Sequence, residues 1–114
     1  MSSPQGLDLV AFTGWLDRVQ PDVLDLSAHV SASLITGGKS NLTYTVSDGQ
    51  RAVIVRRPPL GHVLATAHDM SREYRVMQAL ADSAVPVPQM LSLCEDPDVI
   101  GTPFYVMEHV TGTA

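Results

Sequence analysis

The sequence predicts an α+β domain: a five-stranded, mainly antiparallel sheet with one helix packed against it and a further helix at the N-terminus. Short runs of alternating or β-branched residues, separated by turns that contain glycine, favour consecutive antiparallel strands. Two longer stretches repeat apolar residues at the three- and four-residue intervals of a helix. With 114 residues, of which 45% are hydrophobic, the chain has enough material for one domain with its own core.

The first helix is predicted over residues 7–19, where Leu9, Phe12 and Leu16 recur on one face and Pro21 ends the pattern. Its apolar face must dock on another element. We expect residues 1–26 to form an N-terminal helical extension and residues 27–114 to form the main domain.

Three strands are predicted next, over residues 30–35, 41–47 and 51–57. A glycine-containing turn at residues 36–40 separates the first two, and Asp48-Gly49 between the second and third is a strong hairpin signal. The order of these runs predicts a three-stranded antiparallel meander.

The second half of the chain begins with a loop at residues 58–68 and a helix at residues 69–82, placed by the helical spacing of Met70, Tyr74 and Met77. Two further strands are expected over residues 90–93 and 103–108.

Charge and composition exclude several classes of function. Seven Lys and Arg against 12 Asp and Glu give a net charge of −5, which does not suit a nucleic-acid-binding protein. We find no basic, apolar leader and no run of about 18 apolar residues, so we expect neither a signal peptide nor a membrane partner. One cysteine, Cys94, suits a reducing compartment, and we expect a cytoplasmic protein.

The turn at Gly38-Lys39-Ser40 ends like a phosphate-binding P-loop, but Ser33 stands where that pattern needs glycine, and a strand follows where it needs a helix. Two interpretations stay open: a turn whose backbone amides approach a phosphate, or an ordinary hairpin with a solvated lysine.

Four histidines lack the spacing of metal ligands on one helical face, so we expect no metal site built from them. The most informative charges are Arg56 or Arg57 at the end of the third strand and Glu73 in the following helix. They form either a functional ion pair across the sheet or ordinary solvated charges.

Taken together, several blocks of sequence resemble one family. They are, in order, ITGGKSNLTY (35–44), VRRPP (55–59), AHDMSREYRVM (67–77), VPVP (85–88), LCED (93–96) and GTPFYVME (101–108). They resemble the aminoglycoside phosphotransferase-like family of small-molecule kinases, in particular the branch found alone in bacteria or fused to acyl-CoA dehydrogenases. The resemblance spans about residues 27–112.

The resemblance implies the ATP-binding N-terminal lobe of a protein-kinase-like fold. The first hairpin, Gly37, Gly38, Lys39, Ser40 and Asn41, would cover the nucleotide phosphates. Arg56 would contact the phosphates and Glu73 would hold Arg56, with Arg57 as the second choice because it points to the other strand face.

The resemblance also implies a binding slot for the adenine base. Met107 and Ile54 would line it, and the main-chain groups of Glu108 and Val110 would bind the edge of the base. Met107 and Ile54 are equally suited to a plain core position.

The family's catalytic loop, His-Gly-Asp followed by asparagine, and its later magnesium-binding acid are not found in these 114 residues. We therefore expect no catalytic residue here, a catalytic C-terminal lobe outside this sequence, Mg²⁺ only with that lobe, and no phosphoryl transfer by these residues alone. The acceptor would be a hydroxyl of a small molecule bound mainly by the other lobe.

The alternative is a non-catalytic nucleotide-binding or protein-interaction module. In either case we expect the isolated lobe to self-associate, in line with a mean hydropathy of +0.11.

Overall fold

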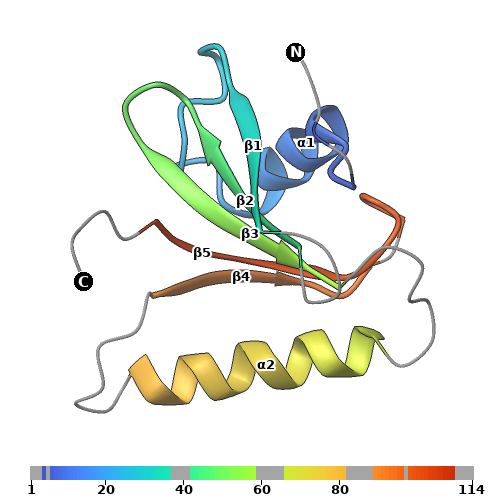
Figure 1. Cartoon of the computed structure of the whole chain (residues 1–114). Helices are drawn as coiled ribbons and strands as arrows, with labels where there is room; N and C mark the ends of the chain where they lie inside the picture. Colours follow the sequence, from blue (N-terminus) through green and yellow to red (C-terminus); the bar gives the residue numbers. More distant parts are fainter. Residues whose placement is uncertain are drawn as a thin grey trace.

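The computed structural model describes residues 4, 6–36, 42–58, 66–81, 89–96 and 98–109. Two helices and five strands follow one another in the order α1 (Leu9–Val19), β1 (Ser31–Thr36), β2 (Leu42–Ser47), β3 (Ala52–Arg57), α2 (Thr66–Ala81), β4 (Met90–Cys94) and β5 (Phe104–Glu108). Figure 1 shows one sheet with α1 on one face and α2 on the other. The predicted α+β architecture is confirmed.

The strands form one sheet in the order β1-β2-β3-β5-β4, and every neighbouring pair is antiparallel. The chain leaves β3, runs through α2, and enters the sheet again at the edge strand β4 before β5 fills the place beside β3. As a result β5 is paired on both sides and lies next to the third strand of the meander. No helix in the described part of the chain is long and apolar enough to cross a membrane.

Helix α1 covers one face of the sheet and shares its main core. The Asp8 carboxylate caps its N-terminus by accepting a hydrogen bond from the Ala11 N–H at 3.2 Å. Phe12 and Trp15 pack against Phe104 of β5, with ring centroids 5.8 and 4.9 Å from the Phe104 ring. The same apolar cluster contains Tyr44, Val46, Val53, Val55 and Val106 from the strands, and also Cys94.

Helix α2 covers the opposite face, where it packs mainly on β4 and β5. A smaller apolar cluster forms there from Met70, Met90, Tyr105 and Met107. Helix α2 begins at Thr66, three residues before the predicted start at residue 69. The apolar repeat that predicted the helix begins only at Met70, and the first turn of a helix needs no apolar residue of its own.

The β2–β3 hairpin turns at Asp48-Gly49, as the sequence predicts. Gly49 has a φ of +97°, a left-handed conformation that glycine adopts without steric cost. The Asp48 carboxylate accepts hydrogen bonds from the N–H groups of Gln50 and Arg51 within the turn, and from the Asp25 N–H at 2.7 Å. Asp48 therefore joins the hairpin to the loop that follows α1.

Strand β1 forms one edge of the sheet, and its Leu34 and Ile35 side chains are exposed. An edge strand offers unpaired backbone groups to another chain. The expected self-association stays a prediction.

Candidate functional site

Arg56 lies in a row of side chains that crosses the sheet. The strand register places Thr43 of β2 opposite Arg56 of β3, and Arg56 opposite Tyr105 of β5. Because side chains alternate along a strand, Ile54 shares this face with Arg56, while Arg57 points to the other face. The face is the one that α2 covers in part.

Arg56, Glu73 and Tyr105 form a closed triangle of hydrogen bonds. Arg56 Nη1 donates to Glu73 Oε1 at 2.8 Å and to the Tyr105 hydroxyl at 3.2 Å. The Tyr105 hydroxyl in turn donates to the same Glu73 oxygen at 2.5 Å, a length typical of a hydroxyl bound to a carboxylate. Arg56 Nε donates to Thr43 Oγ1 at 3.3 Å. The triangle fixes the position of one cation on the sheet.

These contacts shift the ionisation of two members. Burial, together with the hydrogen bond to Glu73, raises the pKa of the Tyr105 hydroxyl, so it keeps its proton at neutral pH. Burial by itself lowers the pKa of Arg56, but its interactions with Tyr105 and Glu73 outweigh burial, and the net shift is upward. Arg56 is therefore a permanent cation with 35% of its side chain exposed.

A second row of side chains lies beside the first and is more apolar. Thr45, Ile54 and Met107 are aligned across β2, β3 and β5. Met107 is buried, and Ile54 packs against the same cluster while remaining partly accessible. One charged row and one apolar row thus lie next to each other on the α2 face.

Arg57 lies away from this site. Its guanidinium is buried on the α1 side, where Nη1 donates to the Gly6 carbonyl at 2.8 Å and Nε donates to the Pro58 carbonyl at 2.9 Å. Burial lowers the pKa of Arg57. The ion pair expected from the sequence therefore joins Glu73 to Arg56 and not to Arg57.

Of the remaining predicted site residues, the structure describes Glu108 alone. Gly37, Gly38, Lys39, Ser40, Asn41 and Val110 lie outside the described residues. Glu108 ends β5 with an exposed side chain, and its N–H donates to the Gln89 carbonyl at 2.8 Å.

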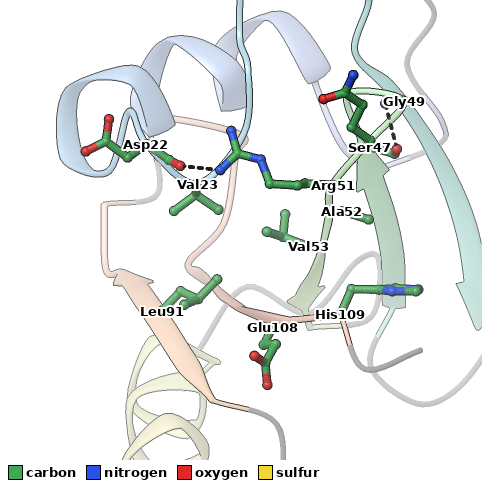
Figure 2. Close-up of a pocket in the computed structure, with 11 residues that line it drawn as sticks. Asp22, Val23, Ser47, Gly49, Arg51, Ala52, Val53, Leu91, Glu108 and His109 are labelled. Carbon is green, nitrogen blue, oxygen red and sulfur yellow. Dashed lines mark hydrogen bonds between the residues drawn. The ribbon is translucent and has the colours of Figure 1, made fainter. Parts of the chain in front are cut away.

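The structure also has a pocket of about 520 Å³ on the α1 side of the sheet, shown in Figure 2. The larger apolar residues that line it are Val23, Val53 and Leu91, which belong to or pack against the α1 core. Arg51 crosses the pocket and donates from Nη1 to the Asp22 carbonyl at 2.9 Å. None of the triangle residues Arg56, Glu73 and Tyr105 lines this pocket, so it is separate from the Arg56 triangle.

Two members of the Arg56 site, Tyr105 and Thr43, were not among the residues predicted from the sequence. The signal for Tyr105 was available, because it stands two residues before Met107 on a predicted strand and must share its face. Which residue of β3 lies opposite Thr43 depends on the pairing register of β2 with β3. The strand pattern alone leaves that register uncertain by one or two residues.

Comparison with known proteins identifies similar chains. A solved structure from Ralstonia eutropha JMP134, provisionally assigned as an aminoglycoside phosphotransferase, is 35% identical and superimposes with a TM-score of 0.70. The match covers 93% of this chain and 29% of that one.

Two longer curated proteins are also similar. Acyl-CoA dehydrogenase family member 10 of Mus musculus is 49% identical over 75 residues, which are 66% of this chain and 7% of that protein. Acyl-CoA dehydrogenase family member 11 of Homo sapiens is 45% identical over 85 residues, 75% of this chain and 11% of that protein. The chain thus spans a small part of each relative.

The sequence model of the phosphotransferase enzyme family, APH, matches residues 31–114, which include every strand of the sheet and the Arg56 triangle. This match covers most of the chain, and the solved neighbour has the same fold. The chain belongs to the APH phosphotransferase enzyme family.

Proposed function

We propose that this chain is the ATP-binding N-terminal lobe of a phosphotransferase that moves the γ-phosphate of ATP to a hydroxyl of a small molecule. The observation that carries the proposal is the Arg56–Glu73 ion pair of 2.8 Å between β3 and α2. In kinases, a cation on the third strand contacts the nucleotide phosphates and a helix carboxylate holds that cation in place.

The chemistry of the site suits a nucleotide. Arg56 offers a fixed positive charge and a planar set of N–H donors, which match the oxygens of a phosphate. Ile54 and Met107 supply the apolar surface on which a flat base can lie, one row away from the cation. Because Glu73 and Tyr105 already orient Arg56, little side-chain freedom remains to be lost when a phosphate binds.

Main-chain groups would also take part in binding the nucleotide. The turn Gly37–Ser40 and Asn41 would cover the phosphates, and the carbonyl of Glu108 and main-chain groups of Val110 would bind the edge of adenine. The Glu108 N–H already donates to Gln89, which is why we assign the carbonyl of Glu108 to the base.

The wider organisation is proposed as well. Residues 27–114 would form the nucleotide-binding lobe and residues 1–26 its helical extension. We assign no Mg²⁺ ligand to the described residues. The metal and the acceptor would be held mainly by a second lobe, and the 114 residues alone would be inactive.

The test is Arg56→Ala in the natural full-length polypeptide that contains this sequence, with Arg75→Ala as the control. Arg75 is an exposed arginine on α2, so its loss changes the net charge equally without touching the triangle. Titration with a fluorescent ATP analogue and assay of ATP turnover should show that Arg56→Ala lowers both affinity and turnover by about tenfold or more, the scale of one charge-assisted contact. Equal kinetics in Arg56→Ala and Arg75→Ala would overturn the proposal.

A further inference from the structure

We propose that Tyr105 is a positioning residue that holds the Arg56–Glu73 pair in its binding geometry. The inference deepens the function proposed above and rests on it. Tyr105 contacts both charged partners through one hydroxyl, which accepts from Arg56 Nη1 at 3.2 Å and donates to Glu73 Oε1 at 2.5 Å.

The ion pair benefits from such support because about a third of each side chain is still exposed to water. The side chains of Arg56 and Glu73 are 35% and 31% exposed. Ion pairs at this level of exposure contribute little by themselves, since salt screens them and holding two long side chains in one conformation costs entropy. A third partner that is already rigid lowers this cost.

Tyr105 is the rigid member. It is fully buried on β5, a strand paired on both sides. Its ring packs at a steep angle against Tyr74 of α2, with centroids 6.1 Å apart, and lies in a cluster with Met70 and Met107. The hydroxyl is therefore presented at a fixed place, and its raised pKa keeps the proton that it donates.

The position of Tyr105 in the fold gives it a specific role. Helix α2, which carries Glu73, packs mainly on β4 and β5, whereas Arg56 is on β3. Tyr105 stands opposite Arg56 in the β3–β5 pairing and faces α2. Its hydroxyl thus connects the helix to the strand that carries the cation, and it sets where Glu73 meets Arg56.

The experiment compares Tyr105→Phe with Tyr44→Phe in the full-length protein. Both changes delete one hydroxyl from a fully buried tyrosine of the sheet, but Tyr44 lies in the core on the α1 side. We expect Tyr105→Phe to raise the KM for ATP, and the dissociation constant of a fluorescent ATP analogue, by roughly tenfold, because the hydroxyl's hydrogen bonds to two charged groups, Arg56 and Glu73, are lost. Tyr44→Phe should leave both within about twofold. Thermal melting of both variants verifies folding.

Two further measurements separate positioning from a general loss of stability. Raising the salt concentration should weaken ATP binding more in Tyr105→Phe than in the wild type, because without the tyrosine hydroxyl the geometry of the partly exposed pair depends on an attraction that salt screens. In an Arg56→Ala background, Tyr105→Phe should have almost no additional effect on ATP binding, because it acts through Arg56.

The inference is overturned if Tyr105→Phe changes ATP binding equally with and without Arg56, or if it leaves the KM for ATP and the salt dependence of ATP binding unchanged. In both cases the proposed function still stands if Arg56→Ala weakens ATP binding. If Arg56→Ala has no effect on ATP binding, the proposed function itself fails.

Discussion

Phe12 offers a direct test of whether α1 belongs to the same folding unit as the sheet. Its side chain is fully buried and its ring lies 5.8 Å from Phe104 of β5 and 6.1 Å from Trp15. Replacing a buried phenylalanine by alanine costs about 3–5 kcal/mol, from lost transfer free energy and the cavity left behind. Domains of this size are stable by about 5–15 kcal/mol, so Phe12→Ala should remove a large part of the total.

Urea unfolding measures this change, and the sequence supplies a single tryptophan as the probe. Trp15 is 8% exposed at the contact of α1 with Phe104, so its fluorescence follows the docking of the helix. Far-UV circular dichroism follows the whole chain. Val10→Ala is the matched control, because Val10 is on the same helix but 65% exposed, and we expect it to change the free energy of unfolding by less than about 0.5 kcal/mol.

A decrease of less than about 1 kcal/mol in the free energy of unfolding of Phe12→Ala would contradict this prediction. So would a fluorescence transition of the variant that moves to lower urea while the circular dichroism transition stays in place. Either result would mean that the helix detaches from a sheet that is stable by itself. A coincident shift of both probes would mean that α1 supports the strands carrying Arg56 and Tyr105.

Two more predictions concern stability. Gly14 lies inside α1 with open space where the methyl group of an alanine would stand, so Gly14→Ala should stabilise the protein by about 0.5–1 kcal/mol in urea unfolding; a destabilised variant would contradict this. Backbone hydrogen bonds from Arg51, Asp25 and Gln50 lower the pKa of Asp48 from 3.8 to about 2. Its contribution to stability is therefore complete above pH 3.8 and is lost as pH falls through about 2, so acid titration should destabilise the wild type more than Asp48→Asn across this window. If the wild type and Asp48→Asn lose the same stability as the pH falls, the role given to Asp48 is wrong.

Much of the Arg56 site could be predicted from local pattern. Alternation along β3 places Ile54 and Arg56 on one face, and the helical spacing around Met70 places Glu73 on a packing helix. The choice between Arg56 and Arg57 needed the structure. Both are arginines on the same strand, and only the packing of α2 on one face and α1 on the other decides which meets Glu73.

The boundaries that moved have a simple cause. The predicted helix began at residue 69, just before its apolar repeat starts at Met70, whereas α2 itself begins three residues earlier, at Thr66. Hydrophobic spacing reports which residues face a core, and the ends of a helix are set by backbone hydrogen bonds that leave no such mark.

The sequence by itself determined the order and type of the elements, the hairpin at Asp48-Gly49 and the family, because these follow from turn chemistry, residue periodicity and ordered motifs along the chain. Only the tertiary structure decided that β5 lies between β3 and β4. Tyr105 therefore stands opposite Arg56 and in hydrogen-bond contact with Glu73. The physical reason is that strand order depends on how α2 returns the chain across the sheet. That path is a matter of packing between residues about 50 positions apart, which no local pattern encodes.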